Sequence, residues 1–144
     1  MNIIPMNAEH VSAIAALEKL CFPDPWCEES VALELHNKLS LWLVAVEQDV
    51  VVGYIGSQTV LDESDMMNMA VHPDHRRKGI AEALIHALCQ KLKAKGSVSL
   101  ALEVRITNEP AKALYEKTGF ELAGRRPNYY RNPKEDALIL KKKL

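Results

Sequence analysis

The sequence predicts a single mixed α/β domain over residues 1–144, with its elements in the order ααβββαβαββ. Three strand-like segments follow one another closely in the first half, which is typical of an antiparallel meander. Helical segments separate the later strands, which is typical of crossover connections. A sheet that begins as a meander and continues through crossovers is mixed, and 144 residues are enough to bury one core.

Two helices are expected before the first strand. Residues 8–21 carry apolar side chains at three- and four-residue steps, the pattern of an amphipathic helix, and residues 28–37 form the second helix. The segment Phe22–Trp26 separates them, because its two prolines cannot continue a helical hydrogen-bond ladder. Cys27 lies where Ser or Thr commonly caps a helix, so we expect the start of the second helix to be weakened by roughly 0.5–2 kcal/mol.

The strands of the meander are rich in β-branched residues. They are predicted over residues 41–47, 50–60 and 66–71, with a tight turn at Gln48–Asp49. A helix over residues 80–95 follows, since its apolar side chains form one stripe. Gly96 then occupies the position after a helix C-terminus where glycine is favoured.

The last third of the chain begins with a strand over residues 98–106, in which apolar and polar side chains alternate. Asn108 can cap the next helix, which extends to Lys117 with Pro110 in its first turn. The final two strands are predicted over residues 120–123 and 137–140, on either side of a loop that contains residues 125–130. The Lys141–Lys143 run is expected to be a solvated tail.

Charge and cysteine content argue against several classes of partner. A net charge of −1 gives no overall field to favour nucleic acid or an anionic membrane, so neither is expected as a partner. The three cysteines lack metal-ligand spacing, so no metal is expected, and they indicate reduced thiols in a cytoplasmic protein. The start of the chain lacks the pattern of a signal peptide, and no apolar run approaches the roughly 18–20 residues of a membrane span.

Residues 69–82 form a candidate anion site. An apolar run ends at Pro73, and a short basic loop turns at Gly79 into a helical pattern, so unpaired N–H groups and the positive end of the helix dipole converge. Gly79 lets the backbone approach a ligand closely, and Ala81 keeps the first turn unobstructed. Positive charge comes from Arg76, Arg77 and Lys78. The predicted ligand is a pyrophosphate, although a basic loop before a helix is more often a solvated connection.

The stretch Arg76–Ala81 resembles the Gln/Arg-x-x-Gly-x-Gly/Ala signature of the GCN5-related N-acetyltransferases (GNAT). In that family the loop holds the pyrophosphate of acetyl-coenzyme A (acetyl-CoA). The resemblance implies a fold in which the strand after residue 65 and the strand after residue 97 splay apart, with the acyl thioester in the gap. It also implies a bulge in the first of these strands. The residues it would bring to acetyl-CoA are Met69, Ala70, Val71, Arg76, Arg77, Lys78, Gly79, Ile80, Ala81, Glu82 and Asn108.

Glu103 is the candidate general base for acyl transfer to an amine. Alternation within residues 98–106 places it on the face opposite the apolar side chains, where the alternative is a solvated carboxylate. Tyr115 is the candidate acid, because a phenol that stays neutral at working pH can protonate a leaving thiolate; its alternative is a core aromatic. His72 and His75 are alternative bases. The cysteines lack a placed histidine partner, so direct transfer is preferred to an acyl-enzyme.

Segments along nearly the whole chain resemble the branch of this family that acetylates the amino-terminal alanine of bacterial ribosomal protein S18. They are Pro25-Trp26, Leu61–Glu63, Asn68–Val71, Leu102–Arg105, Asn108, Ala113–Tyr115, Gly119-Phe120, Asn128–Tyr130 and Glu135–Ala137. The resemblance implies an enzyme that moves acetyl from acetyl-CoA to the α-amino group of S18, with Glu103 as proton acceptor and Tyr115 as proton donor. Trp26, Tyr129 and Tyr130 suit an extended peptide acceptor, and are also ordinary packing residues.

Two other functions remain open at the level of sequence. One is a related enzyme that acetylates a small-molecule amine or a protein lysine. The other is a non-catalytic CoA-binding module, which would keep the loop at residues 76–81 but needs neither Glu103 nor Tyr115.

Overall fold

The computed structural model describes residues 1–144 and contains seven strands, four α-helices and two short 3₁₀ helices. In chain order these are β1 (Asn2–Pro5), η1 (Ala8–His10), α1 (Val11–Cys21), α2 (Glu28–Glu34), β2 (Ser40–Glu47), β3 (Val50–Val60), β4 (Glu63–Val71), η2 (Pro73–His75), α3 (Ile80–Ala94), β5 (Ser99–Arg105), α4 (Glu109–Lys117), β6 (Glu121–Tyr130) and β7 (Glu135–Lys143). The predicted mixed α/β class is confirmed. The structure adds β1, a short edge strand that the predicted order lacks.

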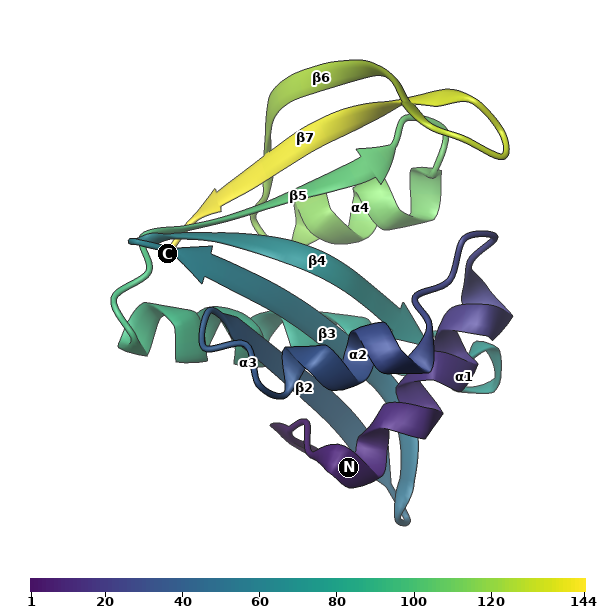
Figure 1. The fold of residues 1–144 in the computed structure, drawn as a ribbon. Coiled ribbons are helices and arrows are strands. Elements are labelled where there is room, and N and C mark those ends of the chain that lie inside the picture. The colour runs from purple at the N-terminus through teal and green to yellow at the C-terminus, as the bar shows by residue number, and fades with distance from the viewer.

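All strands belong to one sheet in the order β1-β2-β3-β4-β5-β7-β6. Only β4 and β5 are parallel, and every other neighbouring pair is antiparallel. Helices cover both faces (Figure 1). The larger apolar cluster packs α3 and α4 against one face, and a second cluster packs α1 and α2 against the other face of β2, β3 and β4.

The predicted separation of the two central strands is confirmed. The β4–β5 ladder pairs Glu63–Asp65 with Ser99–Ala101, and beyond these residues the two strands diverge (Figure 1). The register of β3 against β4 also shifts between Gly56 and Ser57, where Met67 is the extra residue of a β-bulge. The bulge lies at the point where β4 leaves β5.

Two details of the carboxyl-terminal hairpin correct the sequence prediction. The sequence predicts a loop at residues 125–130, but they belong to β6, because a register shift after Arg126 accommodates Pro127 without ending the strand. Lys141–Lys143 are not a solvated tail: they pair with Ser99–Ala101 as the end of β7. A strand with an exposed side can carry lysines there while its backbone stays in the ladder.

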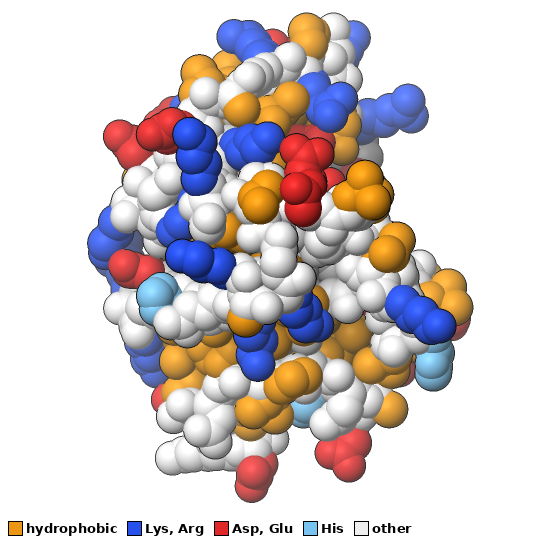
Figure 2. Space-filling model, turned by 90° about the vertical axis from the view of Figure 1, so that its left-hand side faces the viewer, with side chains coloured by type: hydrophobic (Ala, Val, Ile, Leu, Met, Phe, Trp, Pro, Cys, Tyr) orange, Lys and Arg blue, Asp and Glu red, His pale blue; other side chains and the backbone are white.

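Charged side chains of both signs are interspersed with apolar ones on the face shown in Figure 2. This surface agrees with the net charge of −1. None of the helices combines the length and apolar character that crossing a membrane requires.

Candidate active site

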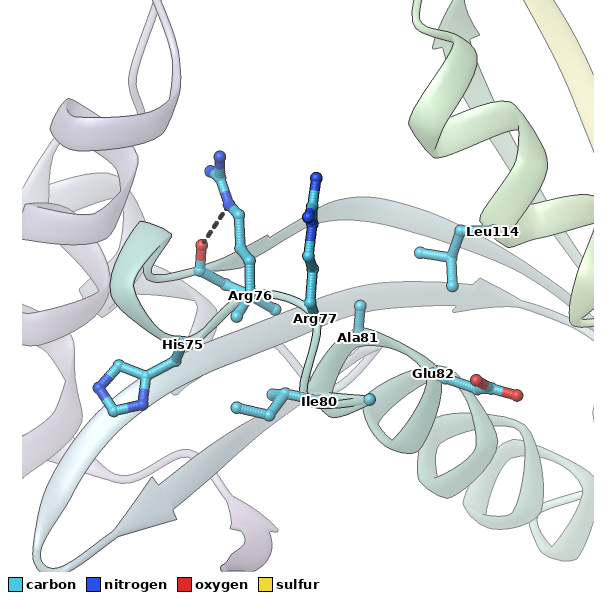
Figure 3. Close-up of a pocket in the computed structure, with 9 residues that line it drawn as sticks. His75, Arg76, Arg77, Ile80, Ala81, Glu82 and Leu114 are labelled. Carbon is cyan, nitrogen blue, oxygen red and sulfur yellow. Dashed lines mark hydrogen bonds between the residues drawn. The ribbon is translucent and has the colours of Figure 1, made fainter.

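A cavity of about 180 Å³ lies where the loop after β4 enters α3 (Figure 3). Its lining is Val71, His75, Arg76, Arg77, Gly79, Ile80, Ala81, Glu82 and Leu114. The guanidinium-bearing side chains of Arg76 and Arg77 extend from the loop on the same side, and Leu114 of α4 stands across from them. The structure therefore brings most of the residues predicted for the pyrophosphate loop around one cavity.

The backbone of this loop is shaped for close approach by a ligand. Gly79 has φ +78°, and a Cβ added there would meet no atom within 4 Å. The first helical hydrogen bond of α3 runs from Ala83 N–H to Gly79 C=O at 3.0 Å, so earlier N–H groups of the helix have no helical partner. These donors lie at the positive end of a 15-residue helix, which favours an anion in the cavity.

Some predicted residues lie outside the cavity lining. Lys78 borders a separate hollow next to Glu47, and the side chain of Ala70 packs in the α1–α2 cluster. Asn108 caps α4, as predicted, by accepting the Ala111 N–H at 3.2 Å. Cys27 begins α2 without a side-chain cap, also as predicted. Whether Lys78 or Asn108 contacts a cofactor stays a prediction.

The backbone of β4 presents polar groups to the gap between β4 and β5. His72 N–H donates to Val52 C=O at 2.8 Å, and alternation then turns the N–H and C=O groups of Val71 and Met69 away from β3. Arg76 Nε donates to Val71 C=O at 3.3 Å, and Met69 N–H donates to Asn68 Oδ1 at 3.0 Å. The main-chain donor that this edge can offer to a carbonyl group in the gap is therefore the Val71 N–H.

Glu103 lies on β5 with 28% of its side chain exposed. Leu102 points into the core with α3, so alternation puts the Glu103 carboxylate on the opposite face. Arg126 Nε lies 3.3 Å from Glu103 Oε1. Hydrogen bonding to Glu103 raises the pKa of Tyr129, with burial adding to this effect. Burial raises the pKa of Asp65 on β4, and the Glu103 charge raises it further.

Tyr115 approaches from the other face of the sheet. Its side chain is 9% exposed, packs edge-on against Phe120 at a ring distance of 5.5 Å, and directs its hydroxyl to Met66 Sδ of β4 at 3.9 Å. Burial raises the pKa of Tyr115 to about 12. The phenol therefore stays protonated at neutral pH. A carboxylate and a neutral phenol thus lie on opposite faces of the sheet beside the same gap.

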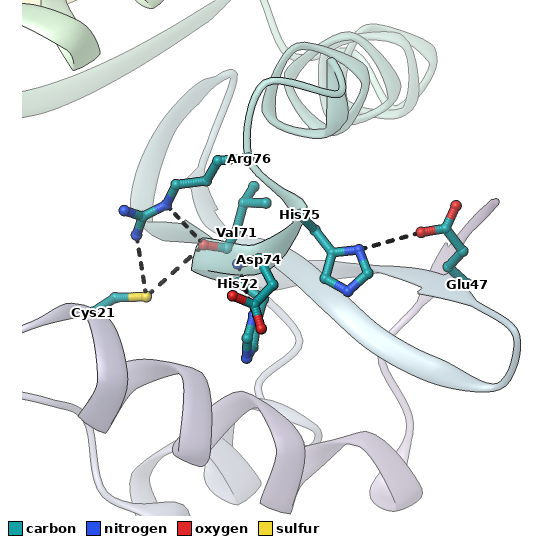
Figure 4. A network of polar contacts seen from close by, with 7 residues as sticks. All are labelled: Cys21, Glu47, Val71, His72, Asp74, His75 and Arg76. Carbon is teal, nitrogen blue, oxygen red and sulfur yellow. Dashed lines mark hydrogen bonds and ion pairs between the residues drawn. The ribbon is translucent and has the colours of Figure 1, made fainter.

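The two alternative bases are engaged in the loop between β4 and α3 (Figure 4). His72 Nδ1 accepts the Asp74 N–H at 3.1 Å, and His75 Nδ1 lies 3.4 Å from Glu47 Oε2 at the end of β2. Figure 4 shows His75 directed toward Glu47, on the side away from Arg76. Their contacts fit a role in fixing the loop.

Two loops meet on the Glu103 face. The β6–β7 loop reaches the loop between α1 and α2, where Asn132 Nδ2 lies 3.4 Å from Asp24 Oδ1. Arg105 holds the β6–β7 loop: its guanidinium donates to Arg131 C=O at 2.8 Å and lies 4.4 Å from the Tyr130 ring centroid. These loops border the space above the carboxylate.

Sequence reasoning does not single out Asp65 or Arg126 as neighbours of Glu103. Asp65 lies in a segment expected to precede the strand, and Arg126 lies in a segment expected to be a loop. The local signal that could have found Arg126 is its place beside Tyr129 in a run that also contains Arg125 and Tyr130.

Comparison with known proteins assigns a family to this geometry. The model of the Acetyltransferase (GNAT) family matches residues 11–120. The chain is 36% identical over 143 residues to the ribosomal protein bS18-alanine N-acetyltransferase of Escherichia coli (strain K12), covering 97% of this chain and 96% of the relative.

Solved structures agree with the sequence comparison. The crystal structure of the ribosomal-protein-S18-alanine N-acetyltransferase from Escherichia coli gives a TM-score of 0.91 at 33% identity, over 99% of this chain and 92% of that chain. Arabidopsis thaliana NAA60 in complex with acetyl-CoA shares the fold, with a TM-score of 0.92 at 17% identity over 99% of this chain and 98% of that chain.

Proposed function

Because the chain belongs to the GNAT family of acetyl-CoA-dependent N-acetyltransferases, we propose that it acetylates the amino-terminal alanine of ribosomal protein S18. The observation that carries the choice of acceptor is the similarity, over nearly the full length of both chains, to a relative named for that reaction.

In this proposal the cavity at the start of α3 binds the pyrophosphate of acetyl-CoA, which supplies an activated acetyl thioester. The free N–H groups of α3 and the side chains of Arg76 and Arg77 stabilise its negative charge. The Val71 main-chain N–H, which alternation turns away from β3, stabilises the carbonyl oxygen as it gains charge. The thioester then lies between Glu103 and Tyr115.

Glu103 and Tyr115 divide the proton transfers. The acceptor nitrogen bonds to the acetyl carbon while the carbon–sulfur bond breaks, and Glu103 takes the proton that the nitrogen loses, directly or through a water molecule. Tyr115 gives its proton to the departing thiolate. The raised pKa of Tyr115 suits this role, because the phenol is fully protonated before the reaction.

The chemistry of amines supports an α-amino acceptor over lysine. An α-amino group has a pKa of about 7.7–8.0, so roughly a tenth of it is neutral at pH 7, whereas lysine at about 10.4 is neutral in fewer than about one molecule in a thousand. One partly exposed carboxylate is an adequate base for the first acceptor. The second would demand much more from the same site.

The test uses the purified enzyme with acetyl-CoA and an S18-derived peptide that begins with alanine and contains a lysine. Mass spectrometry of fragments should place the acetyl group on the terminus. Glu103→Gln and Tyr115→Phe should each lower turnover, by about 10²–10⁴-fold for the base, while CoA binding measured by calorimetry stays close to that of the wild type. Acetylation of the lysine would overturn the acceptor assignment, and undiminished turnover in both variants would overturn the assigned roles.

A further inference from the structure

The carboxylate of Glu18 on α1 is buried among neutral hydrogen-bond donors. The residue is 1% exposed. Its Oε1 accepts the Trp26 N–H at 2.9 Å, and its Oε2 accepts the Asn68 side-chain N–H at 2.7 Å and the Tyr54 hydroxyl. Burial raises the pKa of Glu18, and the hydrogen bond from Trp26 acts in the opposite direction. Burying this carboxylate costs free energy that an apolar side chain would not.

The donors come from three different parts of the fold. Trp26 belongs to the acceptor-side loop, defined as residues Phe22–Cys27 between α1 and α2. Tyr54 lies in the middle of β3, and Asn68 directly follows the bulged residue of β4. Glu18 therefore ties the acceptor-side loop to the irregular part of the strand that borders the gap.

The path continues beyond Asn68 into the backbone. The Asn68 amide donates through Nδ2 to Glu18, and its Oδ1 accepts the Met69 N–H at 3.0 Å. An unbroken series of hydrogen bonds thus connects Trp26 N–H, Glu18, Asn68 and Met69 N–H. One end lies on the acceptor side, and the other is the β4 edge at which the thioester is proposed to lie.

We propose that Glu18 is a positioning residue that, through Asn68, fixes the β4 backbone beside the thioester and the acceptor-side loop relative to each other. This inference rests on the proposed acetyl transfer. It accounts for the choice of a carboxylate at this buried position, since all three partners are donors and a carboxylate only accepts. A glutamine would present an N–H₂ group to at least one donor and disturb the series.

The first test compares Glu18→Gln with Val31→Ala. Val31 is fully buried in the same apolar cluster of α1 and α2, so its truncation loosens that layer without touching the hydrogen bonds. Glu18→Gln should lower kcat and raise the KM for the acceptor peptide, together about 10- to 100-fold in kcat/KM, because a small misplacement of reacting groups costs that much. The Kd for CoA should change little, since the loop at residues 76–82 does not contact Glu18. Val31→Ala should lower thermal stability and keep kcat.

The second test exchanges the two side-chain chemistries in Glu18→Gln/Asn68→Asp. The amide nitrogen at position 18 then donates to the carboxylate at position 68 and to the Tyr54 hydroxyl oxygen, which turns from donor to acceptor. The carboxylate at position 68 still accepts the Met69 N–H, and the amide oxygen at position 18 still accepts the Trp26 N–H. Net charge and side-chain volume are nearly unchanged. We expect the double variant to recover most of the kcat/KM lost in Glu18→Gln.

Three outcomes would overturn the positioning role: kinetics of Glu18→Gln equal to those of Val31→Ala, a loss of CoA affinity as large as the loss of kcat/KM, or no recovery in the exchanged variant. If Glu18→Gln fails to fold, Asn68→Ala interrupts the same series at its other end and is expected to give the same kinetic pattern. Wild-type product analysis tests the acceptor separately. If the acceptor is a different amine, the comparison is repeated with that amine.

Discussion

At the scale of single residues, burial controls the proton chemistry of Tyr115. The phenol has a pKa of about 12 because ionisation would place a charge in the core beside Phe120 and Met66. A group whose pKa is higher in the folded than in the unfolded state stabilises the fold fully below its unfolded pKa, near 10, and loses this contribution as the pH rises toward 12. The same burial therefore keeps the proposed acid protonated and makes the fold sensitive to alkali.

Tyr115→Phe should flatten the alkaline loss of stability. Each group that titrates this way adds a slope of about 1.4 kcal/mol per pH unit to the free energy of unfolding, or about 3 kcal/mol in total for a shift of this size. Denaturant unfolding of the wild type and the variant between pH 9 and about 12 measures the difference. Tyr130, whose pKa burial also raises to about 12, remains in both proteins, so a residual slope is expected. Parallel curves would show that Tyr115 is not the titrating group.

Sequence reasoning works at this scale where a residue acts through its neighbours in the chain. The cap role of Asn108 depends on Ala111, three residues away, and is predictable from turn chemistry. Glu18 and Arg126 could not be assigned, because their partners Asn68 and Glu103 lie far away in sequence and meet them only through the packing of α1 and the register of β6. Long-range pairs of this kind need a known topology.

At the scale of elements, the start of α3 combines two features: Gly79 has a left-handed backbone conformation, and it lines the cavity. Gly79 and Gly96 flank this helix, both have positive φ, and a Cβ at either position would meet no atom within 4 Å. They differ in place: Gly79 lines the cavity, and Gly96 lies beyond the opposite end. Comparing alanine substitutions at the two glycines therefore separates two effects: the loss of stability from the strained backbone, and the loss of ligand affinity from a methyl group in the cavity.

Gly79→Ala and Gly96→Ala should each lower the free energy of unfolding by about 1–2 kcal/mol, the cost of a left-handed conformation for a residue with a Cβ. Only Gly79→Ala should also weaken CoA binding, by about tenfold, which corresponds to about 1.4 kcal/mol. Calorimetric titration with CoA measures this. Equal affinities in the two variants would remove the cavity from the binding site.

Element boundaries are predictable where one periodicity dominates. The predicted bounds of β3 and the start of α3 agree with the structure, because β-branched content and a single apolar stripe identify them. The first strand escapes prediction, since four residues ending in Pro5 give too short a pattern. The extent of β6 is underestimated, because Pro127 and Asn128 are typical of turns; in the structure they lie in an irregularity of β6, and its pairing with β7 resumes at Tyr130.

At the scale of the whole molecule, three residues join the two halves of the sheet. Ser99–Ala101 pair with β4 on one side and with Lys141–Lys143 on the other, and Leu144 N–H donates to Val98 C=O at 3.0 Å. The end of the chain therefore buttresses the only segment of β5 that touches β4 in the ladder.

Removing residues 141–144 should destabilise the protein by about 3 kcal/mol or more, since several backbone hydrogen bonds of about 1 kcal/mol each are lost together. Lys143→Ala is the matched control, because it removes an exposed side chain and keeps the backbone pairing; its effect should stay within about 0.5 kcal/mol. Thermal unfolding of both proteins measures the difference. A truncated protein as stable as the wild type would show that the last residues add nothing to the junction.

Because β4 and β5 diverge after three paired residues, each strand also has an unpaired edge inside an otherwise continuous sheet. Amide and carbonyl groups along these strand edges lack a neighbouring strand. An extended ligand with amide groups of its own could bind between the two edges and complete the hydrogen-bond ladder. A substrate bound in this way would bridge β4 and β5 by hydrogen bonds. The sheet would then gain these bonds when the substrate binds and lose them when the product leaves.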